Sequence, residues 1–122
     1  MRIVSIEDDE NRVRKFKSEF IGHDYVNYYD AKSGIEGLKG QISILLLDHD
    51  LGGMIMVDTA DKNTGSEVVR YMQKNAVDVD NIIVHSLNEP AAQSMVSNLK
   101  NAGYANVYRI PFFSIDYSFT KE

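Results

Sequence analysis

The segment Ile42-Ser-Ile-Leu-Leu-Leu-Asp-His-Asp-Leu51 decides the fold of this 122-residue chain. Residues 42–47 are almost all large and aliphatic, which predicts a strand buried on both faces at the centre of a parallel sheet. Unpaired charges are costly to bury, so Asp48, His49 and Asp50 should lie beyond the carboxyl end of this strand. Open α/β sheets place their ligand crevice at that end. The alternative is that an aspartate only caps the turn that begins at Gly52.

A second acidic cluster, Glu7-Asp-Asp-Glu10, follows the short apolar segment Arg2–Ile6. Adjacent acids raise one another's pKa values unless a cation or hydrogen-bond donors lie among them. Asp9 is a good helix N-cap, but capping gives no reason for the two acids before it. If both strands are parallel neighbours, their acids converge and suit Mg²⁺ or Mn²⁺. The candidate metal ligands are Glu7, Asp8, Asp48 and Asp50.

Composition indicates one small domain without thiol chemistry. The chain has 43% hydrophobic residues, enough for a single packed core. Thirteen basic residues against eighteen acidic give a net charge of −5, which disfavours an extended nucleic-acid surface. Cysteine is absent, which excludes disulfides, zinc–thiolate sites and cysteine nucleophiles. No apolar run approaches transmembrane length, and residues 1–20 do not resemble a signal peptide, so we expect no membrane partner and a cytoplasmic location.

Strands and helices alternate along the chain. Strands are predicted over residues 2–6, 25–29, 42–47, 81–86 and 106–110, and helices over 10–20, 30–38, 64–76 and 88–102. Caps support the last two helices, with Thr64 and Asn88 at their N-termini and Gly103 after the second. This alternation implies a parallel sheet with right-handed crossovers. We therefore predict a flavodoxin-like three-layer sandwich with strand order 2-1-3-4-5, which brings the ends of the first and third strands together.

Helical periodicity predicts which side chains are buried. The expected core positions are Val13, Phe16, Phe20, Val68, Val69, Met72, Ala76, Ala92, Met95, Val96 and Leu99. The basic residues of the first helix, Arg12, Arg14, Lys15 and Lys17, are expected in solvent, with a phosphate-binding patch as the alternative. The mixed polarity of residues 25–29 predicts an edge strand.

Four segments resemble the receiver domains of bacterial response regulators across residues 1–112. They are Ile6-Glu-Asp-Asp-Glu-Asn-Arg12, Leu47-Asp-His-Asp-Leu51, Ile83-Val-His-Ser86 and Ile110-Pro-Phe112. The resemblance implies that Glu7 and Asp8 bind Mg²⁺, that Asp48 accepts a phosphoryl group, and that the Ser86 hydroxyl touches it. Ile110 replaces the family's lysine, and Arg109 is one position off. The terminal helix is expected to be short or missing, leaving residues 113–122 as a short aromatic tail.

A narrower resemblance covers residues 48–95. Asp48-His-Asp-Leu-Gly52, Thr64-Gly65 and Val84-His-Ser-Leu-Asn88, with Met95, are similar to the receiver-like family proposed to process cyclic phosphates at RNA ends. It implies a divalent-metal-dependent cyclic phosphodiesterase with the main-chain carbonyl of residue 50 as a further metal ligand, and it implies a role in RNA repair. The substrate would be a phosphate ester or RNA end.

The chemistry of opening a 2′,3′-cyclic phosphate assigns roles to the candidate catalytic residues Asp48, His49, His85, Ser86 and Asn88. Water must be activated, charge on the phosphate stabilised and a leaving alkoxide protonated. His49 or His85 would be the acid or base. Ser86 and Asn88 would donate hydrogen bonds to phosphate oxygens. Neighbouring strand residues point to opposite faces, so His85 and Ser86 both reach the pocket only if the strand has already turned. A buried structural role for His85 therefore stays open, whereas His49 should reach the pocket more freely.

The remaining questions concern the 53–63 loop and the type of function. This loop is long enough for a lid, and its apolar stretch 54–57 should fold over the site, form a hairpin or meet a partner. Asp58 and Asp61 would join the metal shell or form solvated turns. Self-association would use this loop or the face without a terminal helix. Two alternatives to the enzyme remain, a stand-alone phosphoacceptor receiver and an inactive receiver-like interaction module.

Overall fold

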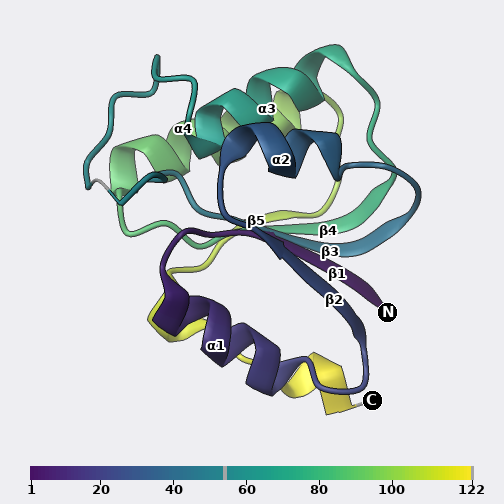
Figure 1. Ribbon diagram of the computed structural model, residues 1–122. Coiled ribbons are helices and arrows are strands. Elements are labelled where there is room, and N and C mark those ends of the chain that lie inside the picture. The colour runs from purple at the N-terminus through teal and green to yellow at the C-terminus, as the bar shows by residue number, and fades with distance from the viewer. Residues whose placement is uncertain (54, 122) are drawn as a thin grey trace.

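The computed structural model describes residues 1–53 and 55–121, and within them one sheet of five parallel strands (Figure 1). The strands are β1 (Arg2–Ile6), β2 (Asp24–Tyr28), β3 (Ile42–Leu47), β4 (Val79–Val84) and β5 (Val107–Arg109). Their order is β2-β1-β3-β4-β5, which confirms the predicted flavodoxin-like topology. The apolar β3 lies in the centre, and the more polar β2 lies at an edge, as expected.

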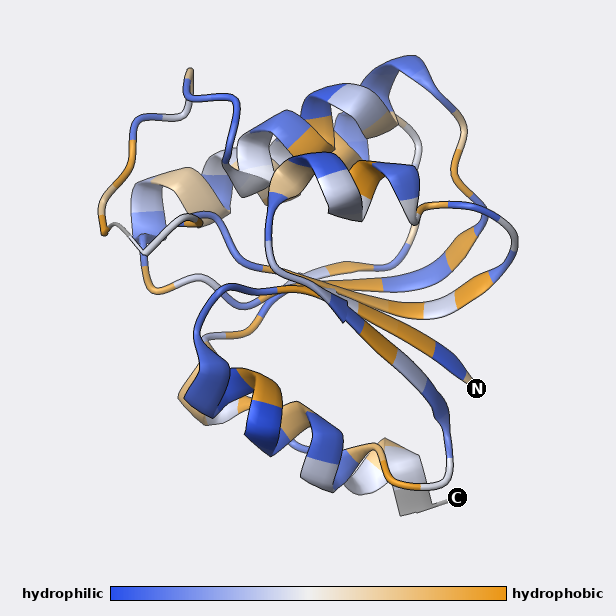
Figure 2. Cartoon of the chain, viewed as in Figure 1, coloured by the Kyte–Doolittle hydropathy of each residue, from blue (hydrophilic) through white to orange (hydrophobic). Residues whose placement is uncertain are grey.

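Helices cover both faces of the sheet (Figure 1). The helices α2 (Ala31–Glu36), α3 (Gly65–Lys74) and α4 (Glu89–Asn101) cover one face, and α1 (Glu10–Glu19) covers the other together with the C-terminal residues. Side chains alternate between these faces along β3, so Leu45 and Leu47 pack towards α2–α4 while Leu46 packs towards α1. Figure 2 shows largely apolar strands between helices in which apolar and polar residues alternate.

The caps and the buried helix faces follow the predicted pattern closely. Asp9, Thr64 and Asn88 accept hydrogen bonds from the first turns of α1, α3 and α4. The expected core side chains are buried, except that Val96 is half-buried and Ala76 is exposed. Ala76 was wrongly predicted as core because α3 ends at Lys74 and Asn75 is already extended. Gly103 has φ +101°, the left-handed conformation expected after a helix.

β4 ends earlier than predicted, and this decides how the site is built. The strand covers Val79–Val84 rather than 81–86, so His85 and Ser86 lie beyond its last residue. They are no longer bound by the alternation of side chains along a strand.

The predicted absence of a long terminal helix is also confirmed for the described residues. Two short 3₁₀ turns, Phe112–Ser114 and Ser118–Lys121, follow β5. The tail nevertheless packs on the domain, because Tyr117 and Phe119 contact Phe20, the residue that follows α1. A hollow of about 580 Å³ remains between this tail and the exposed part of the sheet, lined by apolar side chains that include Ile44, Ile83, Ile110, Ile115 and Phe119.

Among the described residues, no helix combines the length and apolar character needed to cross a bilayer.

Candidate metal centre

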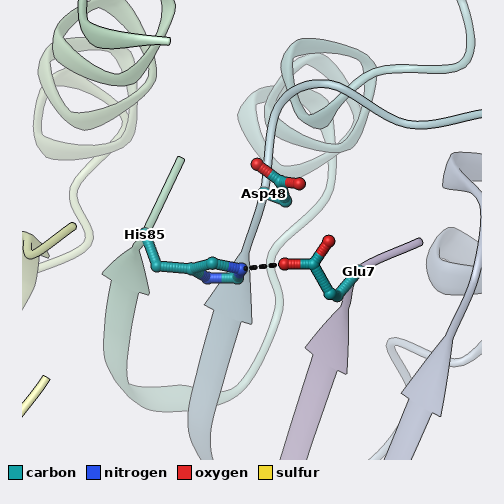
Figure 3. Close-up of side chains that lie close together, drawn as sticks. All are labelled: Glu7, Asp48 and His85. Atoms are coloured by element: carbon teal, nitrogen blue, oxygen red, sulfur yellow. Dashed lines mark hydrogen bonds and ion pairs between the residues drawn. The ribbon is translucent and has the colours of Figure 1, made fainter. Parts of the chain in front are cut away.

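Glu7, Asp48 and His85 meet at the carboxyl ends of three adjacent strands (Figure 3). Each residue directly follows its strand, β1, β3 or β4. Their side chains are 0%, 3% and 0% exposed, and a potential ligand atom from each lies within 4.8 Å of the others. The strand order therefore produces the expected convergence of acids from β1 and β3, and adds an imidazole from β4.

Both oxygens of the Glu7 carboxylate are already hydrogen-bonded. Oε1 accepts from Nε2 of His85 at 2.9 Å, and Oε2 accepts from the amides of Asp8 and Asp9 at 3.0 and 3.1 Å. Burial nevertheless raises the pKa of Glu7. Glu7 is thus held rigidly at the bottom of the site, where its negative charge acts on its neighbours.

Asp48 is the carboxylate with a free oxygen towards the pocket. Its Oδ1 accepts from the His49 amide at 2.8 Å, while its Oδ2 lies 3.7 Å from Nη1 of Arg12. Burial first, and then the charge of Glu7, raise the pKa of Asp48 to about 7. Two acids buried side by side resist being ionised together unless a cation lies between them. Their carboxylate oxygens are hard ligands that fit a divalent cation such as Mg²⁺ or Mn²⁺.

His85 is a buried neutral ring. Burial lowers its pKa to about 4, and its ring packs edge-on against Phe16 and close to Phe112. Because an ionised carboxylate only accepts hydrogen bonds, His85 donates its Nε2 proton to Glu7. Its Nδ1 is buried without a partner among the described residues. The sequence left open whether the His85 ring faces the pocket or the core. In the structure the ring lies beneath the pocket and orients Glu7.

A pocket of about 360 Å³ lies above these acids. Asp8, Asp48, Ser86 and Asn88 line it, and Asp8 accepts a hydrogen bond from the Gly53 amide at 2.6 Å. The Ser86 oxygen accepts from the Asn88 amide at 3.0 Å, so its hydroxyl proton is left to donate. Ser86 is buried, and among the described residues no acceptor takes its hydroxyl proton.

Asp50 lines the same pocket, but its carboxylate is occupied by the loop that follows. Oδ2 accepts from the Met56 amide at 2.8 Å, and Oδ1 accepts from the Val57 amide at 3.0 Å and from Nδ2 of Asn88 at 3.1 Å. Burial raises the pKa of Asp50, but these bonds and one from His49 together hold it below its ordinary value. The Asp50 side chain is not part of the cluster of Glu7, Asp48 and His85.

The structure places His49 away from the pocket it was expected to enter. Its ring is 0% exposed, is not among the lining residues, and contacts Asp50 through Nδ1 at 2.9 Å. Nε2 is buried without a partner among the described residues. Residue 49 is the second residue beyond the end of β3, so the strand periodicity of the sequence could not define the direction of its side chain.

The 53–63 loop contains turns rather than a hairpin of strands in its described part. Asp58 and Asp61 accept hydrogen bonds from amides two residues later, which favours the solvated-turn interpretation of both acids. Of the apolar stretch 54–57, Met54 lies outside the described residues. Ile55 and Met56 are exposed at the rim of the pocket.

Gly65 allows α3 to approach the end of β3 closely. A Cβ atom at this position would lie 2.0 Å from the carbonyl oxygen of Asp48 and 2.6 Å from Cε of Met95. The Gly65 and Met95 positions of the sequence pattern thus share one packing contact with the main chain of Asp48.

Arg12 lines the pocket, although the sequence favoured solvent for the basic face of α1 and offered a phosphate patch only as the alternative. Its Nη1 lies 3.6 Å from Glu7 Oε1. The available signal was its place in the first turn of α1, where a cation is unfavourable in the field of the helix. Arg109 does not take this place, since it is not a lining residue and donates to the Ser86 carbonyl at 2.9 Å.

Comparisons with known proteins agree with this fold. A family model described as "Cyclic-phosphate processing Receiver domain" matches residues 3–101. The signal receiver domain of a protein described as a Luxo repressor, from Vibrio parahaemolyticus, has 16% identity and a TM-score of 0.63, with 98% of this chain and 83% of that chain covered. No curated protein matches the chain.

Two further solved structures are response regulators. The Mn²⁺-bound form of response regulator Rcp1 has 17% identity and a TM-score of 0.57, covering 90% of this chain and 81% of that chain. The solution structure of a response regulator protein from Burkholderia multivorans has 15% identity and a TM-score of 0.58, covering 97% and 86%. At such identities the likeness shows the fold alone.

Proposed function

Because the chain belongs to the cyclic-phosphate processing receiver family, we propose that it is a divalent-metal-dependent phosphodiesterase that opens cyclic phosphates on nucleotides or RNA ends. The observation that carries the proposal is the buried cluster of Glu7, Asp48 and His85 beneath a pocket lined by Asp8 and Ser86. Acids that share a desolvated position and face a pocket are typical of sites that bind cations and phosphates.

Asp8, Asp48 and Glu7 would hold the cation, with the carbonyl of residue 50 as a further proposed ligand. A divalent cation in this position supplies charge neutralisation for phosphate oxygens and lowers the pKa of bound water. Glu7 has both oxygens engaged by protein donors, so its main contribution is negative charge at a fixed place. Asp48 and Asp8 both line the pocket, whereas Glu7 lies beneath it.

The other signature residues bind the phosphate or position the residues that do. Ser86 donates its free hydroxyl proton to a phosphate oxygen, near the N-terminus of α4. The Asn88 side-chain NH₂ group donates to Asp50, and its side-chain oxygen caps α4. His49 and His85 are fully buried, so we assign them to positioning Asp50 and Glu7 rather than to direct proton transfer.

The pocket rim favours a nucleotide end as the substrate. Ile55 and Met56 are 86% and 64% exposed, and Leu87 is 48% exposed, so three apolar side chains surround an anionic site. Such a rim can cover a ribose or base while the phosphate enters the pocket. A volume of about 360 Å³ suits one nucleotide rather than an extended strand.

The proposal is tested by incubating the protein with 2′,3′-cyclic nucleotides and with cyclic-ended RNA, with Mg²⁺, Mn²⁺ or EDTA. We expect a linear phosphomonoester product only with a divalent metal, and none from Asp48→Asn. Asp24→Asn is the matched control, because Asp24 is an exposed aspartate at the first residue of β2. Activity that survives in Asp48→Asn, or no opening with any metal, contradicts the proposal.

Self-association through the 53–63 loop or the sheet face beside the tail stays a prediction. Sedimentation velocity over a range of protein concentrations measures it directly.

A further inference from the structure

Arg12 is the one cationic side chain among the described residues that line the pocket. Its side chain is 21% exposed, and Nη1 lies 3.6 Å from Glu7 and 3.7 Å from Asp48. These are ion-pair distances, longer than hydrogen bonds. Among the described residues the Arg12 guanidinium makes these two ion pairs but no hydrogen bond, so its N–H groups can still donate to an anion.

The position of Arg12 is not explained by its helix. It lies in the first turn of α1, where the helix field favours acids. The guanidinium carbon of Arg12 lies over the ring of Phe112, 5.4 Å from the ring centroid, a cation–π contact that uses none of the N–H groups. The structure therefore holds a cation at the pocket and leaves its donors facing the site.

The pocket needs such a cation if a phosphate is to enter. Its charged lining otherwise consists of carboxylates, namely Asp8, Asp9, Asp48 and Asp50. A divalent cation on the inner acids neutralises only part of this charge. An arginine at the entrance would supply the rest and would bind two phosphate oxygens at once.

We propose that Arg12 is the phosphate-binding residue of this site, and that it exchanges the carboxylates for the substrate phosphate when a metal ion occupies the acids. This inference rests on the proposed function, since it names the group that recognises the substrate. It predicts two effects of opposite sign. Arg12 competes with the metal for Glu7 and Asp48, but it cooperates with the metal in binding the anion.

The test measures Mn²⁺ and inorganic phosphate binding by calorimetry in wild type, Arg12→Gln, Arg12→Lys and Arg14→Gln. Arg14 is the matched control, an exposed arginine on the same helix. We expect Arg12→Gln to bind Mn²⁺ more tightly, by about tenfold, because a repelling charge is removed. With Mn²⁺ saturating, the same variant should lose about tenfold or more in phosphate affinity. Arg12→Lys should recover much of the phosphate binding, and Arg14→Gln should match wild type.

Parallel weakening of both ligands in Arg12→Gln would mean that Arg12 only supports the fold, and overturns the inference. Unchanged phosphate affinity overturns it as well, as does a wild-type protein that binds no Mn²⁺ or no phosphate. The proposed function fails separately. Wild-type protein that shows the expected binding but opens no cyclic phosphate refutes the enzyme and leaves Arg12 as an anion-binding residue. Cyclic-phosphate opening with the same KM in Arg12→Gln refutes the role of Arg12 alone.

Discussion

Replacing Asp48 by asparagine should stabilise the metal-free protein at alkaline pH while it removes metal binding. Asp48 is 3% exposed, and its pKa rises from 3.8 to about 7 because of burial and the nearby charge of Glu7. Asparagine has nearly the same shape but no charge. The substitution therefore removes an unfavourable ionisation from the folded state.

The size of the effect follows from linkage between protonation and folding. A tenfold shift in a protonation equilibrium is worth about 1.4 kcal/mol, so ionising Asp48 costs the folded, metal-free protein up to about 4 kcal/mol relative to the unfolded chain. The sign is that of an acid whose folded pKa is raised. The cost is absent below pH 3.8, grows as only the unfolded chain ionises, and is complete above pH 7. We expect Asp48→Asn to gain about 2–4 kcal/mol at pH 8, after the loss of its ion pair with Arg12.

Urea denaturation in EDTA at pH 8 and pH 4.5 measures the two free energies of unfolding, and Mn²⁺ calorimetry measures the lost site. The stability gain of Asp48→Asn should shrink by about half or more at pH 4.5. At that pH Asp48 is protonated in the folded wild-type protein, so most of the cost of ionising it is absent. At pH 8 His85 is neutral in both proteins, whereas at pH 4.5 the loss of the Asp48 charge also lowers the pKa of His85. Asp24→Asn should change neither quantity. An Asp48→Asn variant that is less stable than wild type at pH 8 in EDTA, or that binds Mn²⁺ within threefold of wild type, would refute the reasoning.

Four further experiments test other parts of the site. Gly65→Ala should cost about 1–3 kcal/mol in urea denaturation, because its Cβ would meet the Asp48 carbonyl; an unchanged midpoint would show that α3 moves freely. His85→Ala should destabilise by about 2–4 kcal/mol through a buried cavity and a lost donor, and a stable variant with intact Mn²⁺ binding would contradict that packing. Asp50→Ala should speed hydrogen exchange at the amides of residues 56–57 about tenfold or more while Mn²⁺ binding persists, and unchanged exchange would place the loop under other control. Acetyl phosphate should leave no lasting phosphate on Asp48, whereas a stable mass increase that Asp48→Asn abolishes would favour a phosphoacceptor.

The fold was predictable because each strand is a short segment whose composition differs from that of the helices and loops around it. The apolar segment 42–47 could only be a central strand, and parallel neighbours then bring Glu7 and Asp48 together whatever the details of the helices. The same reasoning could not place His49. Beyond Leu47 no strand period constrains the side chain, and tertiary contacts with Asp50 and Asn88 decide its direction.

Helical periodicity gave the buried side of α1 but misplaced Arg12. Periodicity separates apolar from polar positions, and it does not distinguish solvent from a polar pocket that the helix end happens to adjoin. A long flexible side chain can also reach sideways over Phe112 to carboxylates on two strands. The end of α3 at Lys74 was missed for a related reason, since Ala76 has the character of a core residue without being in the helix.

The hydrogen bonds of Asp50 have a consequence for mutational scans of this family pattern. The Asp50 carboxylate accepts hydrogen bonds from the loop amides of Met56 and Val57 and from Asn88. Asn88 in turn caps the start of α4. Substituting Asp50 or Asn88 breaks hydrogen bonds that hold the other segments in place. Loss of activity in such a variant therefore does not show that the substituted residue touches substrate. Measuring hydrogen exchange in the loop together with turnover separates loss of loop order from loss of a substrate contact. A second substitution that orders the loop again would restore activity only if the first substitution had acted through loop order.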